Sequence, residues 1–540
     1  MAADKIDRIG LTSVNSNAIG NPLMLDVLNC ISKLSPEKLA ILSLRLRQEK
    51  LQRHAPIARR ADRSQPVAVS FAQERLWFLH QVEPDNLAYH VVGVVGLSGS
   101  LDVPSLRGAV KEIVGRHETL RTTFVEVDGK PLQVVSRDST VEIENDVLAS
   151  GEPAFIDSWI RRKLQKPFDL AHGPLLRMYL GRIDRDWHIL LTVIHHIVSD
   201  GLSMNLYFQE LIEIYRTLRE QQSPELPEIP IQYSDFLIWQ RELLTEAVLN
   251  DELAYWKKQL QGVVDLPALP ADHPTSQAAD QQLASQSTEV PAALVELFKT
   301  MLVQQQATPF IGFLAAFQVV LHHYTGFTDI VIGSPVTGRT RVELERIIGL
   351  FANLHILRTD LSGDPAFPEI LKRTRRVVME AQDHHEMPFQ RLIEELQPAR
   401  KAGQMPLFQT SFTLFSDFEQ IPQVPGLSVI PLSHKNADAM YDLDLNLIQR
   451  QGVLTATLEY KQALFDAGTI AALLRSLHMA ITAITQKSNV RLSELCELLT
   501  KAEEDRALAT VKEREEKRRA KIGTTGRKVL HLQSQKRSTK

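Results

Sequence analysis

The clearest pattern of apolar and polar positions lies in the middle of the N-terminal half. Residues 187–194 (WHILLTVI) form an apolar, β-branched run of the length expected for a buried strand. Further along, apolar residues recur at the spacing of an amphipathic helix, at Tyr207, Leu211, Ile214 and Leu218. The segment between the two, residues 195–201 (HHIVSDG), is therefore predicted to be the turn from a buried strand into a helix.

Strand and helix patterns alternate along most of the chain, which predicts an α/β (α+β) protein with two lobes of similar layout. A Pro-rich stretch at 267–274 is expected to mark the boundary between the lobes. The predicted organisation is an N-terminal helical segment and linker at 1–66, a first lobe at 67–240, a connector at 241–284, a second lobe at 285–487, and a charged helix with a basic tail at 488–540.

The two ends of the chain have their own patterns. Ser35-Pro36 is an N-cap followed by a proline at the first helical position, and it predicts a short helix. The basic stretch 52–66, with Arg59-Arg60, is expected to be an exposed linker. The C-terminal segment is rich in Glu, Lys and Arg, which indicates a solvated helix that frays into a tail; docking to a partner through the termini is the alternative.

Composition narrows the class of protein. Of 540 residues, 44% are hydrophobic and 23% are charged, which is ordinary for a globular protein. The net charge of −4 implies no general affinity for nucleic acid. Only two cysteines are present, too few for a disulfide framework, so we expect a reducing, cytoplasmic location. No uninterrupted apolar run approaches the roughly 20 residues of a membrane span, and no signal-peptide pattern opens the chain.

The residues of the 195–201 turn suit acid–base chemistry. A neutral imidazole at the end of a strand can accept a proton from an attacking amine or hydroxyl group near neutral pH. Asp200 is placed to brace the turn, and Gly201 suits a turn that needs positive φ or close backbone approach. Adjacent residues on a strand point to opposite faces, and no third ligand follows at a convincing spacing, so we expect no metal site at His195 and His196.

The HHxxxDG pattern of residues 195–201 resembles the signature of the condensation domains of nonribosomal peptide synthetases, and of acyltransferases similar to chloramphenicol acetyltransferase. Six further segments resemble the other core motifs of that family, in the family's order and within about residues 67–487. They are SFAQERLWFL at 70–79, RHETLRTTF at 116–124, YSDFLIWQ at 233–240, IGLFAN at 348–353, HHEMPFQRL at 384–392 and MPLFQ at 405–409.

The resemblance implies a fold and a set of site residues. The fold is two chloramphenicol-acetyltransferase-like lobes in a V-shaped arrangement, with a tunnel between them. His196 is implied as the catalytic residue, which deprotonates the amine or stabilises the cationic tetrahedral intermediate. The supporting residues of the motif are His195, which fixes the loop, together with Asp200, Gly201 and Arg339, of which Arg339 is the implied partner of Asp200.

Ser203 and Asn353 are the residues expected to line the substrate tunnel, and Asn353 either positions substrate or holds the tunnel floor. Two positions depart from the family pattern. Leu354-His355 stands where a small polar residue is common, and we expect it to alter the pocket floor. Met204 stands where epimerisation-type relatives often carry Trp, which weakly disfavours epimerisation.

The function implied is formation of an amide bond between an acyl or peptidyl thioester and an amine acceptor. The donor is expected on the phosphopantetheine of a partner carrier protein, with no cofactor bound by this chain itself. The acceptor is a small molecule or is itself carrier-bound. Carrier and adenylation motifs are missing from the sequence, which predicts a free-standing protein or the end of a multi-chain assembly line. Two alternatives remain: an ester-forming acyltransferase of the same fold, and a catalytically silent module that recruits partner enzymes.

Overall fold

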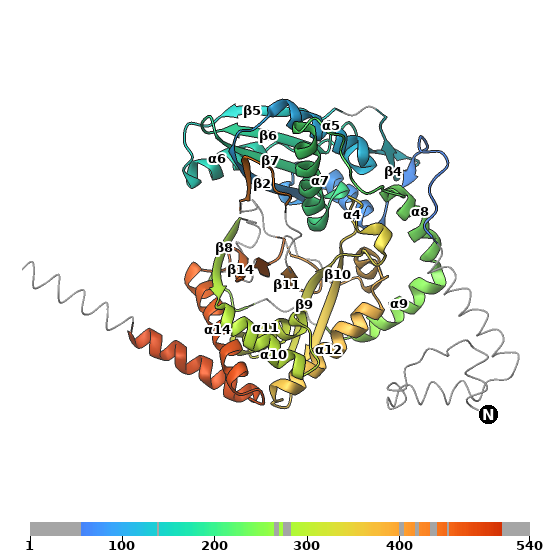
Figure 1. The fold of residues 1–540 in the computed structure, drawn as a ribbon. Helices are drawn as coiled ribbons and strands as arrows, with labels where there is room; N and C mark the ends of the chain where they lie inside the picture. The colour runs from blue at the N-terminus through green and yellow to red at the C-terminus, as the bar shows by residue number, and fades with distance from the viewer. Residues whose placement is uncertain are drawn as a thin grey trace, which may run out of the picture.

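The computed structural model describes residues 56–137, 140–263, 269–273, 282–398, 404–415, 421–432, 440–450 and 453–509. The helix expected after Ser35 and the basic tail beyond residue 509 lie outside these ranges. Within them the chain forms two lobes, an N-terminal one drawn in blue to green and a C-terminal one drawn in yellow-green to red (Figure 1). The α/β fold class expected from the sequence is confirmed.

The N-terminal lobe is built on a mixed five-stranded sheet with the order β12-β2-β7-β6-β5. Its strands are β2 (His90–Gly99), β5 (Ile143–Val147), β6 (Leu176–Arg182), β7 (Trp187–His195) and β12 (Leu427–Pro431). Its helices are α4 (Phe71–Val82), α5 (Val103–Arg116), α6 (Pro153–Leu164), α7 (Gly201–Arg219) and α8 (Tyr233–Leu243). A small sheet of β1 (Val67–Ala68), β4 (Lys130–Val135) and β3 (Thr122–Val127) completes the lobe.

The expected strand and helix on either side of the HHxxxDG segment are both present. Residues 188–195 of β7 are all buried, because this strand lies inside the sheet between β2 and β6. Helix α7 buries Tyr207, Leu211 and Ile214 of the predicted stripe, leaves Leu218 partly buried, and packs against α5. The strand therefore ends at His195 and the helix begins at Gly201, and in the five-residue turn between them only His196 is partly exposed.

The C-terminal lobe is built on a six-stranded sheet with the order β10-β9-β11-β13-β14-β8. Its strands are β8 (Leu283–Val290), β9 (Asp329–Val336), β10 (Asn353–Asp360), β11 (Thr410–Phe415), β13 (Leu443–Arg450) and β14 (Val453–Lys461). Its helices are α10 (Ala292–Gln304), α11 (Pro309–Thr325), α12 (Phe367–Asp383), α13 (Phe389–Leu396) and α14 (Ala467–Gln486), and α9 (Glu246–Gln259) leads into the lobe.

The two faces of this second sheet differ. On β13 the side chains of Leu443, Leu445 and Leu447 are buried in the core cluster that also contains the apolar faces of α10, α11 and α14. The alternate positions, Asp444 and Asn446, are only partly buried and point to the opposite face. Figure 1 shows the helices gathered on one side of the sheet, with the other side turned toward the N-terminal lobe.

Helix α14 is long and apolar enough to cross a membrane by length and composition alone. Half of its most apolar window is buried inside the C-terminal lobe, where it contacts α10, α11, β8 and β14. It is therefore a core helix of this lobe. No other helix of the described ranges passes that test.

Two features of the fold differ from the domain layout expected. Strand β12 belongs by sequence to the second lobe, but it pairs antiparallel with β2 and so completes the sheet of the first lobe. The expectation of an exposed linker before residue 67 is wrong for Arg60, whose side chain is 7% exposed and makes ion pairs with the buried carboxylates of Glu118 and Asp235. Arg63 pairs with the same two carboxylates. The expected domain limits themselves stay predictions.

Candidate active site between the two lobes

The turn from β7 into α7 places the two histidines on opposite sides of the backbone. His195 is 3% exposed, and its Nδ1 accepts a hydrogen bond from the backbone N–H of Ile197 at 3.1 Å. Its ring meets Phe168 and His80 edge to face. Burial, together with the nearby His90, holds the pKa of His195 well below its usual range. His195 is thus a neutral side chain that fixes the shape of the turn.

His196 faces a cavity between the lobes. Its Nδ1 lies 2.7 Å from the backbone carbonyl oxygen of Ser199. A carbonyl oxygen can only accept, so Nδ1 carries the hydrogen and Nε2 keeps its lone pair. His196 is among the residues that line the cavity, and this tautomer leaves its Nε2 able to accept a proton.

A buried ion pair ties the turn to the other lobe. Arg339 donates from Nη1 to Asp200 Oδ2 at 2.9 Å and from Nη2 to Asp200 Oδ1 at 3.1 Å. Asp200 also caps helix α7, because it accepts from the backbone N–H of Ser203 at 2.8 Å, and it accepts from the N–H of Phe351 at 3.0 Å. One carboxylate therefore holds the helix start, the arginine and the segment before β10 together.

Ser203 belongs to the same network. The expectation that it lines the substrate tunnel is wrong for the larger cavity, because its side chain is fully buried and does not line it. Its hydroxyl accepts from Arg339 Nη2 at 2.7 Å and from the N–H of Gly349 at 3.0 Å. It lies two residues into helix α7 from Gly201, on the side that faces Arg339, and this orientation keeps it away from the cavity.

Gly201 differs from expectation in another way. It lacks the expected positive φ, and a Cβ added there would meet no atom within 4 Å. Gly201 does line the cavity beside His196. Its lack of a side chain therefore leaves room in the cavity, and the backbone of the turn does not require glycine.

Gln73 contributes to the site although its position was not expected from the sequence. It is fully buried on α4, and its Nε2 donates to the carbonyl oxygen of Ile197 at 3.0 Å. It also completes a capping box with Ser70 at the start of α4. The sequence contained a clue to this role, because Gln73 is a polar residue inside the SFAQERLWFL motif. Its side-chain amide connects that motif to the histidine turn.

Asn353 holds the loop that leads into α13. Its Nδ2 donates to the carbonyl oxygens of Met387 at 2.8 Å and His385 at 3.3 Å, and its Oδ1 accepts from the N–H of Phe389 at 3.1 Å. The side-chain amide is therefore engaged by the loop, which is the geometry of the loop-holding alternative. Of the neighbouring pair, Leu354 lines the cavity, whereas His355 is buried against Trp256, and burial lowers its pKa to about 4.

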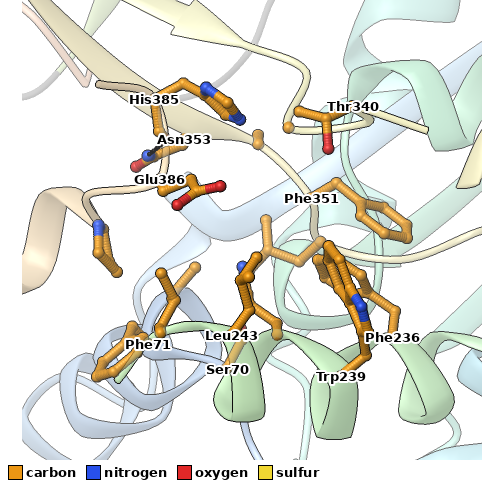
Figure 2. Close-up of a pocket in the computed structure, with 17 residues that line it drawn as sticks. Ser70, Phe71, Phe236, Trp239, Leu243, Thr340, Phe351, Asn353, His385 and Glu386 are labelled. Carbon is orange, nitrogen blue, oxygen red and sulfur yellow. Dashed lines mark hydrogen bonds between the residues drawn. The ribbon is translucent and has the colours of Figure 1, made fainter. Parts of the chain in front are cut away.

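Two cavities adjoin this region. The larger, of about 610 Å³, is lined from the N-terminal lobe by residues of α4, β2 and the histidine turn, and from the C-terminal lobe by residues of β11, β13 and β14. The smaller, of about 90 Å³, is shown in Figure 2, where Phe71, Phe236 and Trp239 lie across from His385 and Glu386. Leu350, Ala352, Asn353 and Pro388 line both cavities, so the two meet at the segment that begins β10.

The wall of the larger cavity opposite the histidine turn is polar. It carries two carboxyl groups, Asp444 on β13 and Glu459 on β14, and the hydroxyl of Tyr441. Burial, followed by the charge of Asp444, raises the pKa of Glu459 to about 7. These residues were not expected at the site, although the alternation of DLDLNL at 442–447 marks polar side chains on one face of a strand. The described residues hold no group of three or more His, Cys, Asp or Glu side chains able to bind a metal ion.

Comparisons with known proteins agree with this fold. The family model described as Condensation domain matches residues 63–508. A linear gramicidin synthase from Brevibacillus parabrevis is 37% identical over 445 residues, which is 81% of this chain and 6% of that protein. The chain thus spans less than a tenth of that relative's length.

Two solved structures are similar over most of their length. One is the X-domain in the complex of the X-domain and OxyB from teicoplanin biosynthesis, with a TM-score of 0.72, 25% identity, and coverage of 81% of this chain and 98% of that chain. The other is SgcC5 from Streptomyces globisporus, with a TM-score of 0.65, 28% identity, and coverage of 78% and 99%.

The fold and the inter-lobe site define a protein with two chloramphenicol-acetyltransferase-like lobes, as expected from the sequence. The match of the family model over most of the chain makes the assignment more specific. This chain belongs to the condensation domain family.

Proposed function

We propose that this protein is a condensation enzyme of nonribosomal peptide, or hybrid peptide and polyketide, biosynthesis. It forms an amide bond between a carrier-bound acyl or peptidyl thioester and an amine. The observation that carries the proposal is the arrangement of His196: Nδ1 donates to the carbonyl oxygen of Ser199, which leaves Nε2 as the proton acceptor, and the residue lines a cavity formed by both lobes. Membership of the condensation domain family supports the same reaction.

In the proposed reaction the amine nitrogen attacks the thioester carbonyl carbon and forms a tetrahedral intermediate. His196 Nε2 accepts the proton that the nitrogen loses, the C–S bond breaks, and the proton passes to the departing thiolate sulfur. The products are an amide and a free thiol, so that atoms and charge balance. An α-amino group has a pKa of about 7.7–8.0, so much of it is already neutral near pH 7.5, and positioning by the cavity contributes beside base catalysis.

The donor is proposed to arrive on the phosphopantetheine arm of a carrier protein, which makes the arm part of the substrate and leaves the chain without a resident cofactor. His195, Asp200, Gly201 and Arg339 are proposed to hold or make room for His196. Asn353 is proposed to hold the floor of the tunnel, and Ser203 is proposed to support the loop. A cytoplasmic location goes with such a role, because carrier proteins and their substrates are made there.

The test uses the purified full chain, an acyl-loaded carrier protein and a panel of amines, with intact-mass detection of the loaded carrier and the product. The expected result is amide formation by the wild type and its loss in His196→Ala. A matched control is His172→Ala, which removes an exposed histidine that lines neither cavity. Product formation by His196→Ala at the wild-type rate would contradict the proposal.

Two other functions have a specific observation in their favour. The structure of SgcC5 is a complex with a naphthyl ethanediol, so transfer to a hydroxyl group to form an ester is a second candidate. The X-domain structure is a complex with OxyB, which makes recruitment of a partner enzyme a third. Replacing the amines with matched alcohols tests the ester, and a chain that forms neither product while binding a carrier would support recruitment.

A further inference from the structure

The polar wall of the larger cavity carries two carboxyl groups in direct register, and burial raises the pKa of both Asp444 and Glu459. Asp444 on β13 pairs with Glu459 on β14, so the two carboxyl groups stand side by side on the face of the sheet that is turned toward the cavity. Like charges directly opposite each other on neighbouring strands destabilise a sheet. An arrangement of this kind is stabilised when a cation binds between the two groups.

The protein provides no such cation within the described residues. Asp444 accepts hydrogen bonds from the Ser411 hydroxyl and the Asn446 side chain, and neither Asp444 nor Glu459 forms an ion pair with any residue that the structure describes. Arg75 is the only Arg or Lys side chain of the described residues that lines the cavity. Its guanidinium group lies over the ring of Phe389 and contacts the sulfur of Met405.

Tyr441 supplies a second, independent sign of an occupant. Its side chain lines the same cavity and is 7% exposed. Its ring packs against Phe408, but its hydroxyl group has no hydrogen-bond partner among the residues that the structure describes. The hydroxyl oxygen is not one of the fully buried unpaired atoms, so it is open to the cavity, where a ligand atom that pairs with it would take the place of water.

We propose that Tyr441, Asp444 and Glu459 bind a cationic hydrogen-bond donor of the substrate, a primary ammonium or guanidinium group, while the reacting group lies at His196. This inference rests on the proposed function and names the substrate class of the same cavity. An ammonium group has three donors, which matches two carboxylates and one hydroxyl oxygen. Burial and the charge of Asp444 raise the pKa of Glu459, and a bound cation would favour its ionised form.

Two pairs of substrates, each with the same carbon chain and differing in one terminal amino group, test the inference and identify which substrate carries the cation. The donor pair is N-acetyl-lysyl and N-acetyl-norleucyl thioester on one carrier, with one neutral amine acceptor. The acceptor pair is 1,5-diaminopentane and pentylamine, with the norleucyl donor. In one of the two pairs, the wild type is expected to favour the cationic member by at least about tenfold in kcat/KM.

The preference is expected to fall below about twofold in Asp444→Asn/Glu459→Gln, while turnover of the neutral substrates persists. Tyr441→Phe is expected to lower the preference by about threefold to tenfold, the effect of one hydrogen bond. The matched control is Glu289→Gln, which removes an exposed carboxylate from the neighbouring strand β8. Thermal unfolding of the double variant at or above the wild-type temperature would show that repulsion was relieved and the fold kept.

The outcomes separate the two proposals. Equal use of neutral and cationic substrates by the wild type overturns the inference and leaves the proposed function standing. The inference is also overturned if the preference is unchanged in the double variant. If no substrate is turned over, the proposed function fails. Calorimetric titration of the protein with 1,5-diaminopentane, and separately with pentylamine, then decides the inference. The inference requires that the diamine bind more tightly to the wild type than to the double variant.

Discussion

Arg339 and Asp200 lie 139 residues apart in sequence and form a bidentate ion pair, with N–O distances of 2.9 and 3.1 Å. Their side chains are 5% and 4% exposed. The pair joins the first turn of α7, directly after the proposed catalytic loop, to the segment between β9 and β10 of the other lobe. The position of His196 relative to the opposite cavity wall therefore depends on this contact.

Asp200→Ala is expected to destabilise the protein by about 3–5 kcal/mol, because it leaves the Arg339 guanidinium group buried without a counter-ion. Thermal or urea unfolding measures the loss. The control is Asp329→Ala, whose carboxylate pairs with Arg358 but is 42% exposed, and which should cost about 0–1 kcal/mol. The double variant Asp200→Ala/Arg339→Met should recover part of the lost stability, because it also removes the unpaired charge. If Asp200→Ala were as stable as the wild type but inactive, Asp200 would be a catalytic residue instead.

His196→Ala is expected to lower the rate of product formation by about 10²–10⁴-fold, the usual contribution of a positioned general base. Its unfolding temperature should stay close to that of the wild type, since His196 is only partly buried and its one hydrogen bond is to the turn itself. Single-turnover kinetics with a loaded carrier measures the rate. A variant with a nearly unchanged rate would contradict the assignment of His196 as the catalytic residue.

Asn353→Ala is expected to loosen the loop that it holds, because two carbonyl oxygens and one N–H lose their partner. A loss of about 1–3 kcal/mol in unfolding free energy is expected. Because residues of the loop line both cavities, kcat should fall together with stability. A fall in kcat larger than that of Asp200→Ala, at the same loss of stability, would point to contact between Asn353 and the substrate. Asn353→Asp is the informative companion, since it keeps the acceptor and removes the two donors.

The stability of the protein is expected to fall as the pH drops below about 6.5. Burial lowers the pKa of His355 to about 4, which is below the value of about 6.5 expected in the unfolded chain. The unfolded state therefore binds more protons between these two values, and the stability that is complete above pH 6.5 is lost as the pH falls toward 4. The lowered pKa values of His90 and His195 change stability with pH in the same direction as that of His355. The raised pKa of Glu459 has the opposite effect and partly offsets them.

His355→Phe isolates one of these groups. Between pH 6 and 4.5 the variant should lose unfolding free energy less steeply than the wild type, by up to about 1.4 kcal/mol per pH unit. Urea unfolding at several pH values measures both slopes. Above pH 7 the difference between the two proteins should be constant, and parallel slopes over the whole range would show that His355 is protonated in the folded state.

A carrier-bound donor is expected to react with a kcat/KM at least about tenfold higher than the matching coenzyme A or N-acetylcysteamine thioester. Contacts with a whole carrier domain supply binding energy that can orient the thioester, and tenfold corresponds to about 1.4 kcal/mol. Initial rates with the two donors at equal concentration give the ratio. Equal rates would favour an acyltransferase that uses free thioesters.

The local elements of the site could be read from the sequence because they depend on neighbours along the chain. An apolar run that ends in a polar turn and continues as an amphipathic helix specifies β7, the histidine turn and α7, and the structure agrees with each. The pairing of Asp200 with Arg339 came from the resemblance of the motifs, since nothing in the spacing of two residues 139 positions apart indicates a contact.

Tertiary structure alone decided which way the side chains of these elements face. Ser203 follows the histidine turn closely, yet rotation along α7 directs it into the ion-pair network and away from the cavity. Arg60 lies in a basic stretch that looks solvated, and only the folded lobe brings two buried carboxylates to it. Asp444 and Glu459 are proposed to bind substrate because the register of β13 with β14 places them side by side. They lie on the face of the sheet that lines the cavity between the lobes. Periodicity along the chain specifies elements, but contacts between elements depend on register and packing, which residues distant in sequence determine.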